Sequence, residues 1–143
     1  MENNIIEIKI PFKTPTSNHL YWHRGNMKIM TKDARELREE IRKIVIKSLP
    51  FVCANLNDGL KVEIEVHENW HTKKGDVARK DIANREKFLI DSVFKALDID
   101  DKYIFEHKFI KVQNNEEYSI IKIGGVKMAE DEKKEESAEE ERS

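Results

Sequence analysis

Apolar and polar residues alternate in two segments of the chain, a pattern that predicts β-strands. In residues 5–10, Ile6, Ile8 and Ile10 fall on one side and charged residues on the other. Residues 60–66 repeat the pattern with leucine, valine and isoleucine. A period of two puts every second side chain on the same face of a sheet, so each segment should have one face in the core.

Two other segments have apolar residues at helical spacing. Residues 32–47 place Leu37, Ile41 and Val45 on one face and follow Thr31, a good helix N-cap. A second helix is predicted from near Asp81 to about residue 97.

The remaining segments predict loops, a turn and three further strands. Residues 14–26 and 67–80 are expected to be polar loops, and residues 98–101 a tight acidic turn. Residues 27–30 fit a short strand. Residues 104–112 and 118–123 are predicted to pair as a hairpin. The order β-α-β-α-β-β predicts an α+β fold: one mixed β-sheet with two main helices packed on it.

Composition favours one polar, intracellular domain. The chain has 143 residues, of which 38% are charged, and no apolar run that could span a membrane. Its single cysteine, Cys53, excludes an internal disulfide, and the N-terminus does not resemble a signal peptide, so a cytoplasmic location is expected. Residues 127–143 contain eight acidic and four basic side chains and no aromatic residue. We therefore expect a domain over residues 1–126 and a disordered or solvated acidic tail over residues 127–143.

The candidate chemistry lies at the two ends of the second helix. Asp81 stands where the helix begins, and Asp100 and Asp101 stand in the turn after it. Carboxylates that converged there would suit Mg²⁺, which prefers oxygen ligands, and Lys87 could stabilise a phosphate. A straight helix of about 16 residues is roughly 24 Å long, so the turn must bend back, the helix must end early, or a second copy must supply one end. The ordinary alternative is that these are capping, turn and surface residues.

The same stretch resembles the signature of the RusA family of Holliday junction resolvases. That signature has a basic residue, an Asp-x-Asp-Asn motif, a lysine three residues later and an Asp-Asp pair after a helix. The matching positions are Lys80, Asp81, Asn84, Lys87, Asp100 and Asp101. The opening strand with Pro15 and Asn18 is also similar, and the similarity covers about residues 5–125.

The resemblance implies a metal-dependent endodeoxyribonuclease that makes paired, symmetric nicks in four-way DNA junctions during recombination and repair. It implies Mg²⁺, with Mn²⁺ as an alternative, held by Asp81 and Asp101 with Asp100 as a weaker ligand. Lys87 would be the catalytic lysine, and no small-molecule cofactor is implied. Family members act as homodimers, and a two-fold axis would relate two sites to two opposed strands.

One motif position departs from the family. Ala83 stands where the resemblance implies a second metal-binding aspartate, and a methyl group cannot coordinate a metal. Either the substitution was introduced to inactivate the site, or this is a natural relative without cleavage, so Ala83 belongs to the candidate catalytic set as a missing carboxylate.

Basic residues near these motifs are the candidate DNA contacts. They are Arg24, Lys28, Lys73, Lys74, Arg79, Lys80 and Arg85. Three functions stay open from sequence: a junction-resolving nuclease, a junction-binding protein that does not cleave, and an unrelated interaction domain whose acidic tail recruits a partner.

Overall fold

The computed structural model describes residues 5–15, 21–49, 55–80 and 82–126. It contains the predicted α+β fold, a mixed four-stranded sheet with two helices and a small two-stranded sheet. Cys53, Asn18, Asp81 and the predicted tail, residues 127–143, lie outside the described residues. No helix in the described ranges is both long and apolar enough to cross a membrane.

The four-stranded sheet has the order β1-β6-β4-β5. Its strands are β1 (Ile6–Ile10), β6 (Tyr118–Gly125), β4 (Leu60–Glu68) and β5 (Ile104–Gln113). β6 pairs antiparallel with both β1 and β4, and β5 runs parallel to β4. The two alternating segments predicted from sequence are therefore strands of one sheet, and β4 extends two residues beyond its predicted end.

The predicted hairpin between the last two strands is wrong, because β4 lies between them. A helix joins β4 to β5, and such a crossover returns the chain parallel to the strand that it left. β5 thus takes one edge of β4, and β6 takes the other. The connection between β5 and β6 passes the end of β4, where the Asn114 N–H donates to the Glu68 carbonyl at 3.0 Å.

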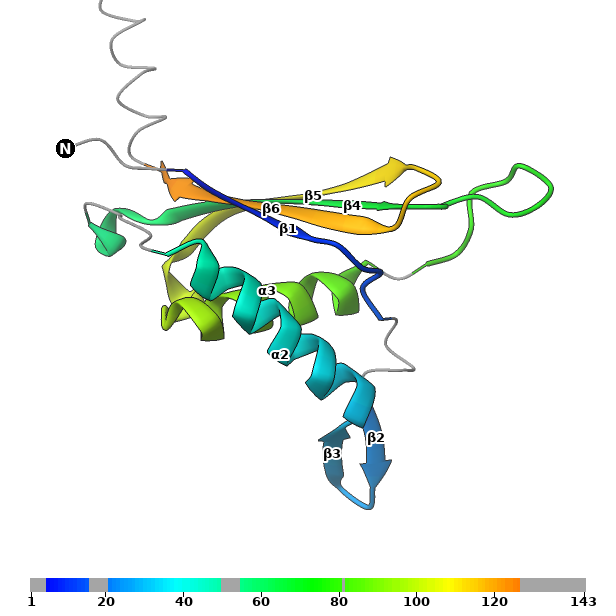
Figure 1. The fold of residues 1–143 in the computed structure, drawn as a ribbon, viewed down its shortest axis with the longest axis horizontal. Helices are drawn as coiled ribbons and strands as arrows, with labels where there is room; N and C mark the ends of the chain where they lie inside the picture. Colours follow the sequence, from blue (N-terminus) through cyan, green and yellow to red (C-terminus); the bar gives the residue numbers. More distant parts are fainter. Residues whose placement is uncertain (1–4, 16–20, 50–54, 81, 127–143) are drawn as a thin grey trace, which may run out of the picture.

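Both main helices, α2 (Lys32–Lys47) and α3 (Ala83–Leu97), cover the same face of the sheet (Figure 1). α2 has the predicted bounds, and the Thr31 hydroxyl accepts from the Ala34 N–H at 3.2 Å. α3 begins at Ala83, with Ile82 rather than Asp81 at the N-cap position. The core is packed between the sheet and these helices. Its fully buried apolar residues include Ile8, Ile10, Ile41, Val45, Leu60, Ile64, Phe88, Leu89, Ile121 and Ile123.

A hairpin occupies part of the segment predicted as a loop over residues 14–26. β2 (Tyr21–Arg24) pairs antiparallel with β3 (Met27–Met30), and Gly25 adopts a φ of 63° between them. The short strand expected at residues 27–30 is present. The hairpin lies beside the N-terminal end of α2 (Figure 1).

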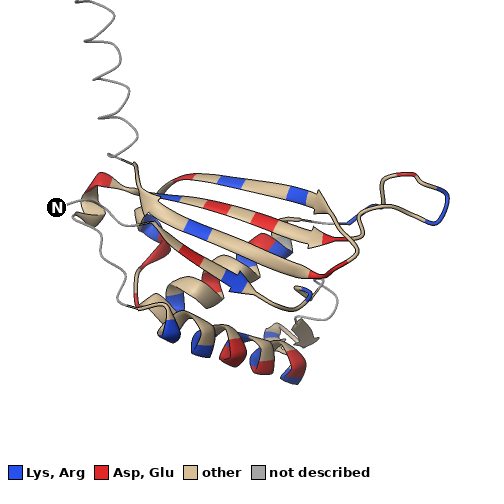
Figure 2. Ribbon diagram, turned by 45° about the horizontal axis from the view of Figure 1, so that its top comes forward, with Lys and Arg blue, Asp and Glu red and all other residues tan. Residues whose placement is uncertain are grey.

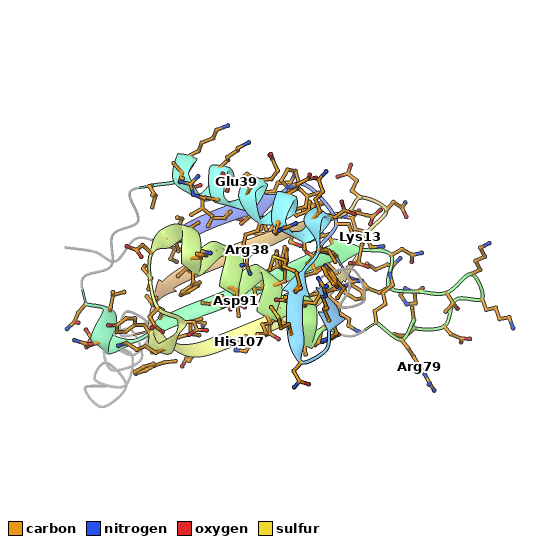
Figure 3. The ribbon with its side chains drawn as sticks, turned by 90° about the horizontal axis from the view of Figure 1, so that it is seen from below. Lys13, Arg38, Glu39, Arg79, Asp91 and His107 are labelled. Carbon is orange, nitrogen blue, oxygen red and sulfur yellow. The ribbon has the colours of Figure 1, made fainter. Side chains whose placement is uncertain are left out.

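The connection between β4 and α3 extends away from the body of the protein as a long loop (Figure 1). It is closed by an isolated β-bridge between His71 and Val77. We call residues 69–80 the arm. Lys73, Lys74 and Arg79 are exposed on it, and Figure 3 shows Arg79 pointing away from the sheet.

Candidate active site

An open hollow of about 240 Å³ lies along α3. The residues that line it are Ala83, Glu86, Lys87, Ile90, Asp91 and Asp101. The first five are spaced three and four apart, so they form one face of the helix. Only Asp101 comes from another element, the short 3₁₀ helix η2 (Asp101–Tyr103).

A reversal of the chain after α3 brings Asp101 to this hollow. Asp98 ends the helix in the left-handed conformation, with a φ of 57°. The Asp100 carboxylate then accepts from the Lys102 N–H at 2.9 Å and caps η2. α3 is complete over 15 residues, roughly 22 Å. The acidic turn therefore bends back along the helix, one of the three arrangements that its length allowed.

The predicted site residues are brought together only in part. Lys87 and Asp101 are exposed side chains that line the same hollow. Asp100 is engaged in capping and is not among the lining residues. Asp81 and the side chain of Asn84 lie outside the described part of the chain. Ala83 is exposed and lines the hollow at the first turn of α3, so a longer side chain there would project toward this surface.

Sequence reasoning missed Glu86 and His107. Glu86 lines the hollow one turn after Ala83, and its carboxylate lies against the imidazole of His107 on β5. Figure 3 places His107 beside the helix that carries Asp91. The helical spacing of Ala83, Glu86 and Lys87 was visible in the sequence. The contact between Glu86 and His107 could not be seen in the sequence, because the two residues are 21 positions apart and lie on different elements.

A buried ion cluster fixes the start of α3 against the end of β4. The Glu68 carboxylate pairs with the Arg85 guanidinium, and both side chains are only 1% exposed. Lys80 donates to the other Glu68 oxygen at 2.8 Å. Buried charges are costly unless they are paired, so this cluster holds the first turns of α3 in one position relative to the sheet.

Trp70 forms one wall of this cluster. The Arg85 guanidinium lies 5.0 Å from the ring centroid, and the ammonium groups of Lys80 and Lys111 lie at 5.4 and 4.9 Å. The indole N–H donates to the Val66 carbonyl at 3.1 Å. Trp70 is therefore a buried support for these cations.

The candidate DNA contacts fall into two groups. Arg24, Lys73, Lys74 and Arg79 are exposed, on the β2–β3 hairpin and on the arm. Lys80 is 26% exposed and bonded to Glu68. Arg85 does not lie on a DNA-binding surface, because its guanidinium is buried and paired with Glu68. The expectation that Arg85 contacts phosphate is corrected on this ground.

A comparison with known protein families tests the resemblance that the motif indicated. Residues 11–124 match the family described as Endodeoxyribonuclease RusA. The chain belongs to the RusA family. The matched range includes the hollow, the ion cluster, the arm and the β2–β3 hairpin, and the family implies a Holliday junction resolving nuclease.

Two other comparisons add no functional information to the RusA family assignment. No curated protein matches the chain. A solved structure described as GDP-form protofilaments of Bacillus thuringiensis serovar israelensis TubZ matches with 14% sequence identity and a TM-score of 0.39. The match covers 97% of this chain and 32% of the TubZ chain, so this chain spans about a third of that protein.

The buried cluster in this RusA-family chain predicts a large stability effect. Replacing Glu68 by alanine leaves the Arg85 guanidinium buried without its carboxylate, so we expect the free energy of unfolding to fall by about 3–5 kcal/mol. Glu39→Ala removes an exposed helix pair and should cost less than about 0.5 kcal/mol. Urea denaturation followed by circular dichroism measures both. Equal, small losses for the two variants would contradict the structural role of the cluster.

Proposed function

We propose that this chain is a Holliday junction resolving endodeoxyribonuclease whose active centre is the hollow along α3, with one carboxylate missing at Ala83. The observation that carries the proposal is the shared lining of this hollow by Lys87 and Asp101, which come from opposite ends of a motif typical of the RusA family. Asp81 precedes the same turn of α3 in the sequence and completes the proposed set.

The donor chemistry of the hollow fits Mg²⁺. Its acidic residues supply carboxylate oxygens, which hard divalent cations prefer, and no cysteine lines it. Within the described ranges, no group of three or more histidine, cysteine or acidic residues is arranged to hold a metal ion. The proposed ligands, Asp101 and Asp81, come from the match to the RusA motif, with Mn²⁺ as an alternative ion. Asp100 is less suited because it caps η2.

Three residues of this chain, Lys87, Arg85 and Glu68, have a part in the proposed cleavage besides the metal ligands. When bound, Mg²⁺ would supply a Lewis acid for the phosphodiester and promote deprotonation of water. Lys87 would place its ammonium group beside the phosphate, where negative charge develops as the bond to the leaving oxygen breaks. Arg85 and Glu68 would position Lys87 by fixing the helix that carries it.

A second candidate function is binding of junction DNA without cleavage. Ala83 favours it, because an exposed methyl group lines the hollow where the family motif has a carboxylate. The two candidates share the same DNA surface and differ only in chemistry.

The basic residues of the arm and the β2–β3 hairpin are the proposed contacts to DNA phosphates. Lys73, Lys74 and Arg79 are exposed on a loop that extends beyond the sheet, and Arg24 and Lys28 are exposed on the hairpin. Trp22 on the same hairpin is 47% exposed, which suits stacking on an unpaired base. The proposed substrate, a four-way junction, offers both phosphates and bases at its centre.

Restoring the carboxylate tests the nuclease proposal. On a synthetic four-way junction with Mg²⁺, we expect no nicks from this chain and paired, symmetric nicks from the Ala83→Asp variant. In that restored background, Asp101→Asn or Lys87→Ala should reduce the cleavage rate by about a hundredfold or more. Asp100→Asn is the matched control and should have a smaller effect, because its carboxylate caps η2.

The cleavage assay, together with the measured affinity of both proteins for the same junction, also separates the two candidate functions. Tight binding of the junction by both proteins, with no nicks from the Ala83→Asp variant, would favour a non-cleaving protein. Equal affinity for the junction and for a linear duplex would contradict both candidates.

The exposed lysines at the tip of the arm predict a change in salt dependence. Replacing both Lys73 and Lys74 by glutamine should lower the slope of log affinity against log salt concentration by up to about 1.8, since each neutralised phosphate contributes about 0.9. Fluorescence anisotropy with a labelled junction measures the slope. The matched control replaces Lys43 and Lys47 on the outer face of α2 and should leave the slope unchanged. Identical slopes for the arm variant and this chain would remove the arm from the DNA surface.

A further inference from the structure

The outer part of the arm has no apolar core of its own. Each of residues 71–80 is exposed or half-buried, and Val77 is 68% exposed. Figure 2 shows basic residues at the far end of the arm, beyond the ends of the strands. Burial of apolar surface therefore does not hold this part of the arm in place, and its position depends on hydrogen bonds.

Backbone hydrogen bonds give the arm the form of a closed loop. The Ala78 N–H donates to the Trp70 carbonyl at 2.8 Å, and the Thr72 N–H donates to the Asp76 carbonyl at 2.7 Å. Gly75 adopts a φ of 90° in the turn that they enclose, a conformation that favours glycine. Each of these bonds joins two residues of the arm, so it shapes the loop without fixing the direction in which the loop leaves the sheet.

Gln113, the last residue of β5, joins the sheet to the base of the arm through three hydrogen bonds. Its side-chain oxygen accepts from the Trp70 N–H at 2.8 Å and lies 2.8 Å from Nδ1 of His71. Its amide nitrogen donates to Oδ1 of Asn69 at 2.9 Å. Because the nitrogen is engaged with Asn69, the oxygen is the acceptor for both other groups, which requires the tautomer of His71 with hydrogen on Nδ1. One side chain thus holds three consecutive residues of the arm.

The base of the arm adjoins the proposed active centre. Lys80, the last residue of the arm, bonds to Glu68 beside the buried Arg85. Ala83 follows three residues later at the start of α3. A change in the direction of the arm would therefore move the lysines at its tip relative to the hollow.

We infer that Gln113 is a positioning residue for DNA binding, which holds the arm in one direction so that its tip meets a junction without prior ordering of the loop. A segment that is ordered before binding does not lose conformational entropy on binding, and its affinity is higher for that reason. The inference rests on the proposed function, because that function assigns the arm to DNA. Gln113 carries no charge and acts through the arm.

Hydrogen exchange in the absence of DNA tests the hold of Gln113 on the arm. Gln113→Met keeps a side chain of similar length and removes the amide, so the backbone amides of Trp70 and His71 should exchange at least tenfold faster than in the unchanged chain. Nuclear magnetic resonance measures the rates. Asn115→Met, at an exposed position in the turn after β5, is the matched control and should leave them unchanged. The amides of α2 should keep their rates in both variants, which verifies that the fold is intact.

Junction binding tests the consequence for DNA. Gln113→Met should weaken binding of a synthetic four-way junction about tenfold, measured by fluorescence anisotropy, and Asn115→Met should not. The slope of log affinity against log salt concentration should stay unchanged, because the same phosphates are contacted once the loop is ordered. In a chain that already carries Lys73→Gln and Lys74→Gln, Gln113→Met should weaken binding less than threefold, since two residues that act as a unit do not have additive effects.

The outcomes separate the inference from the proposed function. Unchanged exchange rates in the Gln113→Met variant, or faster exchange with unchanged junction affinity, would overturn the inference alone. An equal loss of affinity with and without the tip lysines would also overturn it, because Gln113 would then act independently of the arm. An unchanged chain that binds no junction DNA would contradict the proposed function and the inference together.

Discussion

The candidate active site depends on the chain reversal that follows α3. A 15-residue helix separates the two halves of the acidic motif by roughly 22 Å, so the halves can share a site only if the chain turns back along the helix. Asp98 makes that turn in the left-handed conformation, and Asp100 stabilises the next turn through its cap. The result is that Asp101 and Lys87 line the same hollow.

The start of the same helix is fixed by a buried ion cluster. Glu68 at the end of β4 holds Arg85 inside the protein, and Trp70 lies against the cations around it. This cluster and the reversal act at opposite ends of α3, and between them they position the residues of the hollow. Helix α3 therefore carries both a residue of the buried ion cluster and the residues of the proposed active centre. The proposed DNA contacts lie on the arm and on the hairpin, which extend from the body.

The sequence predicted the elements better than their pairing. α2 was predicted with its bounds, because Thr31 and the apolar period mark both its face and its start. The pairing of β5 with β4 could not be predicted from local pattern, because it depends on how the crossover through α3 returns to the sheet. Short polar strands such as β2 also lack a strong alternation, so their residues resembled a loop.

The burial of Arg85 could have been predicted from the alternating pattern of β4. Glu68 lies in phase with Leu60, Val62, Ile64 and Val66, the buried positions of β4, so the alternation itself places a carboxylate in the interior. A buried carboxylate requires a cationic partner. Arg85 and Lys80 provide it. Arg85 is therefore removed from the surface contacts that were expected from its position near the motif.

We propose that oxygen ligands around the hollow of α3 bind a divalent ion once position 83 carries a carboxylate. The most direct test is nuclear magnetic resonance of the Ala83→Asp variant titrated with Mn²⁺, whose paramagnetism broadens the signals of nearby amides. We expect broadening centred on the first two turns of α3 and on Asp101, and weaker broadening in the unchanged chain. Broadening confined to the acidic residues after Val126, with the signals of Lys87 and Asp101 unaffected, would contradict it.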